Sequence, residues 1–240
     1  MVNRFIRHAV ILAAGKGTRM GSMTREIPKP MLSVQGRPML ELILGRLSSA
    51  GAENFLVITG YHHEAIEDHF RDSPLRLQFR IQEPVNGTGS ATLLARDFTG
   101  NEPFLLTYAD ILCDPSEYVR CVSTLEQNQH CAAAVAVKSV DDPWQGAAVY
   151  EEAGRITRII EKPPKGTSNT CWNSAGFYAF RPVIFDYLGR IKPSPRGEYE
   201  LTSALDGMLQ DGLELRISVI QGNWHDVGRP EDLRAVDLLS

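Results

Sequence analysis

Hydrophobic and polar positions along the first 110 residues alternate between the patterns of buried strands and amphipathic helices. Short apolar runs and one alternating stretch predict strands at Val10–Ala14, Phe55–Thr59, Leu75–Ile81 and Phe104–Tyr108. Apolar residues at helical spacing predict helices at Pro38–Leu47, Glu64–Phe70 and Thr88–Arg96. Such strand–helix alternation implies right-handed crossovers, and therefore a mostly parallel sheet with helices on both faces.

The pattern changes after residue 130, where strands follow one another with fewer helices between them. Strands are predicted at Cys131–Val137, Ala147–Tyr150, Ile156–Ile160, Trp172–Phe180 and Leu213–Ile220, the second and third as a hairpin. Helices are predicted at Pro182–Leu188, Tyr199–Gln210 and Glu231–Leu238. The expected fold is α/β: a Rossmann-like three-layer α/β/α arrangement with a mostly parallel sheet and additional antiparallel strands in the C-terminal half. Because no Gly/Ser linker interrupts the chain, we expect one domain over residues 1–240, with halves at 1–130 and 131–240.

Composition and charge narrow the class of protein. The 240 residues carry 25 Lys and Arg against 29 Asp and Glu, a net charge of −4, which disfavours a nucleic-acid partner. The apolar stretch from Ala9 to Ala14 is too short for a signal peptide, and no run approaches the roughly eighteen residues of a membrane helix. The cysteines lack a C-x-x-C pair and are expected to be reduced and partly buried: Cys113, Cys121, Cys131 and Cys171. We therefore expect a soluble, cytoplasmic protein without a membrane partner; a homo-oligomer is left open.

The first chemically informative segment follows the first predicted strand. It reads LAAGKGTRM over residues 12–20 and continues with IPKPM over residues 27–31. Four bases and one acid lie between positions 13 and 31: Lys16, Arg19, Arg25, Lys29 and Glu26. In an acidic protein this local excess of cations beside glycines predicts a phosphate-rich ligand, with a solvated loop as the alternative. Nothing after Gly15 fits the Walker A pattern, and Met20 stands where the dinucleotide fingerprint needs its third glycine.

Two acids predict a metal site next to this ligand. Asp110 ends an apolar strand, at the sheet edge where α/β proteins place their ligands. A carboxylate beside a polyphosphate is repelled by several kcal/mol unless a cation bridges them, and Mg²⁺ is the usual bridge. The alternative is that Asp110 caps the next helix, although Asp114 before Pro115 is a better cap candidate. Asp226 offers a second carboxylate, in a segment that could equally be a turn.

Further polar segments lie beside apolar elements: Gln82 with residues 86–90, Glu161–Pro163, Asn173–Gly176 and Arg196–Thr202. Together these segments resemble, in order and over nearly the whole chain, the sugar-1-phosphate nucleotidylyltransferases (NDP-sugar pyrophosphorylases). Residues 12–20 with 28–30 look like that family's L-A-[AG]-G-x-G-T-R-[LM]…P-K-P signature. Residues 86–91, 109–110, 161–163 and 226–228 fall where its later motifs belong.

The resemblance implies a reaction and a set of site residues. A nucleoside triphosphate and a sugar 1-phosphate would give an NDP-sugar and pyrophosphate by in-line attack at the α-phosphorus, with Mg²⁺ as cofactor. UTP or dTTP and glucose 1-phosphate are favoured. Catalytic cations would be Arg19, Lys29 and Lys162. Nucleotide-binding residues would be Leu12, Ala14, Gly15, Gly17, Thr18, Arg19, Gln82, Gly87 and Thr88. Sugar-phosphate contacts would come from Gly146, Glu161, Lys162, Gly176, Arg196, Glu198 and Thr202, and metal ligands from Asp110 and Asp226.

Some positions depart from the family pattern, and some alternatives stay open. Ala109 stands where the family usually has Gly, and Ser203 where an Asp commonly follows the E-L-T motif. The chain stops soon after Asp226, which leads us to expect a single activity without the acyltransferase or β-helix extension of some relatives. The alternatives are a GTP–mannose-1-phosphate enzyme, a CTP-dependent enzyme including one that uses phosphocholine, and a non-catalytic nucleotide-sugar sensor. A nicotinamide-dependent oxidoreductase is disfavoured by Met20.

Overall fold

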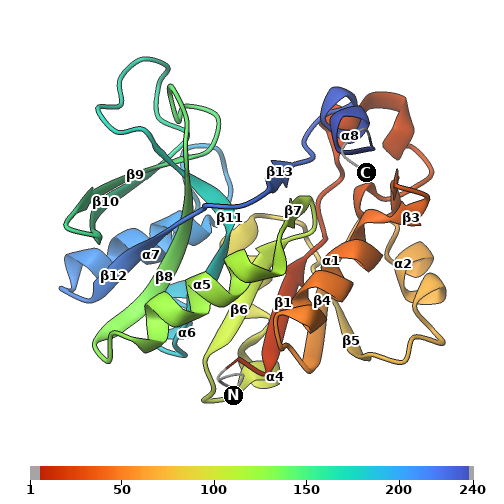
Figure 1. The fold of residues 1–240 in the computed structure, drawn as a ribbon, viewed down its shortest axis with the longest axis horizontal. Coiled ribbons are helices and arrows are strands. Elements are labelled where there is room, and N and C mark those ends of the chain that lie inside the picture. Colours follow the sequence, from red (N-terminus) through yellow and green to blue (C-terminus); the bar gives the residue numbers. More distant parts are fainter. Residues whose placement is uncertain (1–5, 238–240) are drawn as a thin grey trace.

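The protein, described by a computed structural model over residues 6–237, is built around one large mixed sheet (Figure 1). Within these residues nine strands hydrogen-bond in the order β5-β4-β1-β6-β11-β8-β12-β10-β9. Their bounds are β1 (His8–Leu12), β4 (Asn54–Thr59), β5 (Arg76–Ile81), β6 (Phe104–Tyr108), β8 (Cys131–Ser139), β9 (Ala147–Glu152), β10 (Arg155–Glu161), β11 (Trp172–Phe180) and β12 (Glu214–Val219). Strands β5, β4, β1 and β6 are mutually parallel, and β12 runs parallel to β8. Strands β9, β10 and β11 pair antiparallel with their neighbours, so the predicted mixture of strand directions is confirmed.

Helices cover both faces of this sheet. They are α1 (Met39–Ser49), α2 (His63–His69), α3 (Thr88–Leu93), α4 (Arg96–Thr99), α5 (Pro115–Glu126), α6 (Ile184–Leu188), α7 (Leu201–Gln210) and α8 (Pro230–Asp237). Two 3₁₀ helices, η1 (Thr18–Thr24) and η2 (Lys29–Met31), and a small hairpin of β2 (Ser33–Val34) and β3 (Arg37–Pro38) follow β1. Apolar residues of α1, α2, α5 and α8 pack on one face and those of α3, α6 and α7 on the other, which confirms the three layers. Among residues 6–237, no helix combines the length and apolar character that crossing a membrane requires.

Several predicted boundaries are wrong. The first strand ends at Leu12 rather than Ala14, because the chain leaves the sheet there to form the loop that precedes η1. The single helix predicted over residues 88–96 is split into α3 and α4. The hydroxyl of Thr92 donates to the carbonyl oxygen of Thr88 at 2.7 Å, a back-bond that bends helices. Leu238, predicted to end the last helix, lies outside the described residues.

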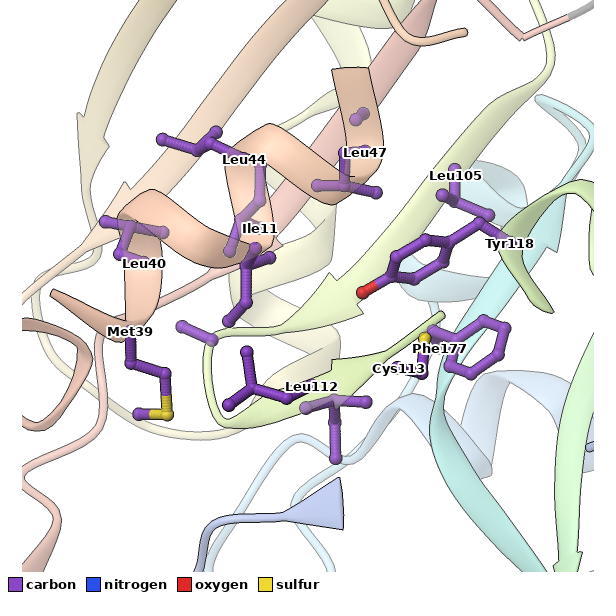
Figure 2. Close-up of a cluster of buried hydrophobic side chains, with 14 of the residues drawn as sticks. Ile11, Met39, Leu40, Leu44, Leu47, Leu105, Leu112, Cys113, Tyr118 and Phe177 are labelled. Atoms are coloured by element: carbon purple, nitrogen blue, oxygen red, sulfur yellow. The ribbon is translucent and has the colours of Figure 1, made fainter. Parts of the chain in front are cut away.

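A further two-stranded sheet and the extent of one long helix, of which only the start was anticipated, are absent from the sequence predictions. Strand β7 (Ile111–Cys113) follows β6 and pairs antiparallel with β13 (Trp224–Asp226), and α5 begins directly afterwards. Figure 2 shows Leu112 and Cys113 of β7 packed among side chains of α1, α5 and β11. Burial of each such side chain is worth about 1.5–3 kcal/mol, so the chain is firmly held just after residue 110.

Candidate active site

The site is a cavity of about 430 Å³ beside the carboxyl ends of β1 and β6. Twelve of the sequence-predicted site residues line it: Leu12, Ala14, Gly15, Gly17, Thr18, Arg19, Lys29, Gln82, Gly87, Thr88, Asp110 and Glu198. Six lining residues were not selected from the sequence: Ala13, Pro30, Val85, Ala91, Tyr108 and Ala109. The volume falls in the range of small-molecule sites, and the position is the sheet edge where α/β folds bind ligands.

The glycine turn after β1 brings two cations to this cavity. Gly17 adopts the left-handed conformation, with φ 63° and ψ 33°, and a Cβ at this position would lie 2.8 Å from Cβ of Lys29. The carbonyl oxygen of Gly17 accepts hydrogen bonds from the Met20 amide at 2.9 Å and from the Thr24 hydroxyl at 3.1 Å. Glycine is therefore required here both for the backbone conformation and for the close approach of η2, which carries the buried Lys29.

A second loop, between β5 and α3, forms the opposite wall. Gly87 has φ +129°, and a Cβ there would lie 2.4 Å from the carbonyl oxygen of Tyr199, so the two segments are in close backbone contact. The buried amide of Gln82 organises this loop by donating to the Gly87 carbonyl at 2.8 Å and to the Ser90 hydroxyl at 2.9 Å. Because the amide hydrogens of Gln82 are used within the loop, a ligand in the cavity meets an acceptor at this side chain.

The two acids predicted to bind metal lie at two paired strands, Asp110 in the turn just before β7 and Asp226 at the end of β13. Asp226 ends β13 and is paired with Ile111 of β7, and the Val227 amide donates to the Asp110 carbonyl oxygen at 2.9 Å. Nζ of Lys29 lies 2.5 Å from Oδ2 of Asp110. Asp226 is exposed and is not one of the residues lining the cavity, yet desolvation by the surrounding protein and then the charge of Asp110 raise its pKa to about 6.

This carboxylate pair is suited to a cation that a ligand also coordinates. The positive charges of Lys29 and then Arg19 lower the pKa of Asp226, so both cations face the carboxylate pair. Within residues 6–237, no group of three or more His, Cys, Asp or Glu side chains could hold a metal ion alone. Mg²⁺ is commonly bound by one or two protein carboxylates, with substrate phosphate oxygens as further ligands. The residues therefore fit a divalent ion that arrives with a phosphate ligand.

A separate polar cluster surrounds Arg196. Its guanidinium contacts three carboxylates, with Nη2 at 2.8 Å from Glu200, 3.3 Å from Glu198 and 3.7 Å from Glu161. The Thr202 hydroxyl donates to Glu161 at 3.2 Å, and burial followed by the charge of Glu200 raises the pKa of Glu161. Glu161, Glu200 and Thr202 line a second cavity of about 600 Å³. Three carboxylates already surround Arg196, so a phosphate that binds this arginine competes with them.

Five predicted residues line neither cavity: Gly146, Lys162, Gly176, Arg196 and Asp226. For the first three, a close approach of backbone segments defines the surroundings. The Lys162 amide donates to the Gly146 carbonyl at 2.7 Å, and Lys162 has a positive φ of 43°. A Cβ on Gly146 would lie 2.3 Å from Oδ1 of Asn173, and one on Gly176 would lie 2.8 Å from Cγ1 of Ile111. Gly176 thus packs against the residue that follows Asp110.

Comparison with known proteins assigns the chain to a family. Residues 8–239 match the Nucleotidyl transferase family. The chain belongs to this family. The prediction of family and enzyme class from the glycine turn and the later motifs is thereby confirmed.

Individual members of the family are similar over most of the chain. "Bifunctional protein GlmU" of Methanococcus aeolicus is 36% identical over 226 residues, which are 94% of this chain and 52% of GlmU. The chain thus spans about half the length of the GlmU relatives that it matches. "UTP–glucose-1-phosphate uridylyltransferase AglF" of Haloferax volcanii is 35% identical over 231 residues, covering 93% of this chain and 92% of AglF.

Solved structures confirm the fold class. A UDP-glucose pyrophosphorylase complexed with UDP-glucose superposes with a TM-score of 0.88 at 26% identity, covering 98% of each chain. A putative glucose-1-phosphate thymidylyltransferase from Bacillus anthracis gives a TM-score of 0.85 at 27% identity, covering 97% of this chain and 94% of the other.

Two polar side chains of this nucleotidyl transferase were not selected as site residues from the sequence, although Asn173 belongs to the polar segment 173–176 noted there. Tyr108 lines the first cavity, and its hydroxyl lies 3.3 Å from that of Tyr178. Asn173 carries a buried Oδ1 that has no hydrogen-bond partner among the described residues and is directed at Gly146. Both side chains sit in apolar strands, β6 and β11, where core packing is the ordinary expectation, so only their surroundings distinguish them.

Proposed function

We propose that this protein transfers a uridylyl or thymidylyl group from UTP or dTTP to a sugar 1-phosphate, with glucose 1-phosphate favoured, and releases pyrophosphate. The observation that carries the proposal is that Asp110, Arg19 and Lys29 line a glycine-lined cavity, and that Asp226 lies beside them. Anionic and cationic groups together suit a metal-bound polyphosphate. We further propose a single domain in the cytoplasm, supported by the continuous sheet and by four free cysteines.

The chain's own groups would bind and orient the triphosphate. Backbone amides near Gly15 and Gly17 supply donors to phosphate oxygens, and Arg19 and Lys29 supply positive charge. Transfer at the α-phosphorus depends mainly on positioning and electrostatic stabilisation, so no protein nucleophile is required. Lys162, after β10, would neutralise charge near the reacting phosphates.

Asp110 and Asp226 would hold Mg²⁺ together with phosphate oxygens, and the bound ion would neutralise charge that develops on those oxygens. Lys29 pairs with Asp110 in the structure. Binding of the triphosphate would give Lys29 a second anionic partner, so that Asp110 becomes available to the metal. This exchange keeps the buried lysine paired at each stage.

The acceptor that Gln82 presents bears on base preference. Uracil and thymine carry an N–H donor at N3, which an acceptor at Gln82 would complement. Cytosine and guanine also carry donors, at N4 and N1, so this contact is compatible with the proposed bases without selecting them alone. The uridylyltransferase and thymidylyltransferase names of similar proteins support the same choice.

The sugar phosphate would lie between the cavity and the Arg196 cluster. Glu161 and Thr202 are hydrogen-bonded to each other and would bind sugar hydroxyls together with Glu198. Gly146 and Gly176 would allow the sugar to approach the backbone, and Arg196 would contact the sugar phosphate. A site built to pair each hydroxyl discriminates strongly against a sugar that lacks one.

The decisive test is pyrophosphate release measured with a panel of triphosphates and sugar 1-phosphates in the presence of Mg²⁺. We expect release with UTP or dTTP and glucose 1-phosphate, loss with EDTA, and recovery with added Mg²⁺. Release only with GTP and mannose 1-phosphate, with CTP, or with an amino-sugar phosphate would move the substrate assignment within the family. Binding of an NDP-sugar without release under any combination would establish the sensor.

Asp110→Asn tests the metal role directly. We expect turnover to fall at least about a hundredfold, as for other groups that stabilise developing charge, while far-ultraviolet circular dichroism stays unchanged. The matched control is Asp186→Asn, because Asp186 is an exposed residue of α6 paired with Arg96 at 3.4 Å. Near-normal turnover of Asp110→Asn would show that the metal is held elsewhere.

A further inference from the structure

The chain segments next to the two proposed metal ligands differ in how deeply they are buried. Asp110 is followed by β7, whose three side chains are buried in the core (Figure 2). Asp226 is reached through residues 221–223, which are exposed and lie outside any strand of the large sheet. Figure 1 shows this connection running from β12 to β13, where β13 lies beside β7. Something other than the core must fix the path of residues 221–223.

Glu117, in the first turn of α5, holds this connection. Its carboxylate is 1% exposed, and its two oxygens accept the amide hydrogens of Gln221 at 3.2 Å and Gly222 at 2.9 Å. Nε of Arg120 donates to it at 3.4 Å. A buried carboxylate is stable only when its oxygens are bonded, so these contacts keep Glu117 and the connection together.

Asp114 adds a second point of attachment. It stands at the N-cap position of α5, as the sequence suggests, but its carboxylate makes no bond to the helix. Instead Oδ2 accepts the Asn223 amide at 3.0 Å, and the Asp114 amide donates to the Asn223 carbonyl at 3.1 Å. Three consecutive amides, 221–223, are therefore bonded to two acids at the start of α5.

Gly222 is the residue that permits this contact. A Cβ at position 222 would lie 2.8 Å from Oδ2 of Asp114 and 3.1 Å from Oε1 of Glu117. Its φ is not positive, so the absence of a side chain, and not backbone conformation, is what the position requires. The close fit at Gly222 is an observation separate from the hydrogen bonds, and it also indicates that Glu117 and Asp114 hold residues 221–223 against α5.

We propose that Glu117 is a positioning residue that fixes Asp226 beside Asp110. Asp110, β7 and the start of α5 follow one another in the chain, so both carboxylates are placed relative to this segment. Asp110 is placed by covalent continuity, and Asp226 by the pairing of β13 with β7 together with the Glu117 bonds to the connection that leads into β13. The inference rests on the proposed nucleotidyl transfer, in which the two acids share a metal ion. A looser connection lowers the fraction of protein with both acids in place and weakens metal binding by that fraction.

Glu117→Gln perturbs the connection with the smallest change of shape. One carboxylate oxygen becomes an NH₂ group, which faces an amide hydrogen of Gln221 or Gly222 and cannot accept it. We expect the Mg²⁺ concentration for half-maximal pyrophosphate release to rise about tenfold, the effect of losing one buried acceptor, while kcat at saturating Mg²⁺ changes less than about twofold. Glu126→Gln, near the other end of the same helix, should leave both values unchanged.

A second readout needs neither metal nor turnover. Amide hydrogen exchange of the metal-free protein, followed by NMR, should be about tenfold or more faster at Gln221 and Gly222 in Glu117→Gln, with unchanged rates in β8. Gly222→Ala should reproduce both effects by steric displacement. Its control is Gly45→Ala in α1, where an added Cβ meets nothing within 4 Å.

The two proposals fail in different ways. If wild-type protein releases no pyrophosphate, the proposed function fails, and the exchange rates still report whether Glu117 holds the connection. If wild-type protein is active, unchanged Mg²⁺ dependence in both Glu117→Gln and Gly222→Ala overturns the positioning role. A drop in Tm without any shift of the Mg²⁺ dependence does so as well, because it assigns Glu117 to stability alone.

Discussion

Replacement of Gly17 by alanine tests how closely the glycine turn and the buried lysine are packed. Gly17 has φ 63°, a conformation that costs an L-residue about 1–2 kcal/mol. The new Cβ would also lie 2.8 Å from Cβ of Lys29 and 3.2 Å from Cγ2 of Thr24. The Lys29 contact is with the base of the side chain, next to the backbone, so a change of rotamer cannot relieve it.

Gly212→Ala separates the two costs. Gly212 follows α7 with φ +78°, and an added Cβ there meets nothing within 4 Å. The free energy of unfolding of Gly212→Ala should therefore fall only by the conformational cost of about 1–2 kcal/mol. In Gly17→Ala, overpacking should lower the free energy of unfolding by a further 1–3 kcal/mol, roughly. The total loss for Gly17→Ala is then about 2–5 kcal/mol. Because Lys29 must shift, the KM for the triphosphate should also rise in Gly17→Ala and stay constant in Gly212→Ala.

Urea unfolding followed by far-ultraviolet circular dichroism measures the stability of both variants, and pyrophosphate release measures KM. Equal losses of stability in the two variants, together with an unchanged KM for Gly17→Ala, would refute the reasoning. That result would mean that the turn and η2 move apart freely, and that the position of Lys29 does not depend on the glycine.

Three other predictions concern separate parts of the molecule. Gly176 has φ +78°, and an added Cβ would lie 2.8 Å from Cγ1 of Ile111. In Gly176→Ala the free energy of unfolding in urea should therefore fall by about 2–4 kcal/mol, and turnover should fall as well. A variant as stable as the wild type would contradict the packing described for β11. An aromatic disulfide reagent should label one thiol of the native protein, that of the exposed Cys171, because the other three thiols are buried. After denaturation it should label all four. Rapid labelling of more than one thiol in the native protein would disprove this burial. Burial and then the charge of Glu200 raise the pKa of Glu161, so the folded protein favours its protonated form and loses stability as pH rises through that pKa. Glu161→Gln should therefore increase Tm at neutral pH, remove this pH dependence and lower turnover; a Tm that falls at neutral pH would contradict it.

The parallel half of the sheet could be predicted from the sequence because β1, β4 and β6 are buried along almost their whole length, and because β5 alternates between apolar and polar positions. Strand β6 was predicted with its observed bounds, and α1 began one residue after the predicted start. For helix α5 the start at Asp114 and Pro115 was anticipated but the extent was not, although Tyr118, Cys121 and Leu125 lie at helical spacing on the buried face.

Strands β7 and β13 could not be predicted in the same way. Each has three residues, too few for a period to be recognised, and each exists because it pairs with a segment more than 100 positions away. The Glu117 contacts have the same origin, because they join residues separated by 104 and 105 positions. A contiguous motif such as residues 12–20 reveals the ligand class, whereas the groups that hold the second acid in place are visible only in three dimensions.

The position of the site follows from how the two halves of the chain share the sheet. Strand β6 is parallel to β1 on one side and antiparallel to β11 on the other, so it is the last strand of the parallel half. Asp110 lies directly after it, and Gly176 of β11 contacts Ile111. The part of the cavity wall formed by residues 12–30 and the polar groups of the second half therefore meet at the end of one strand. Since β7 and β13 join across this junction, a metal shared by Asp110 and Asp226 would couple the two halves directly, and loosening either partner should affect metal affinity before it affects the fold.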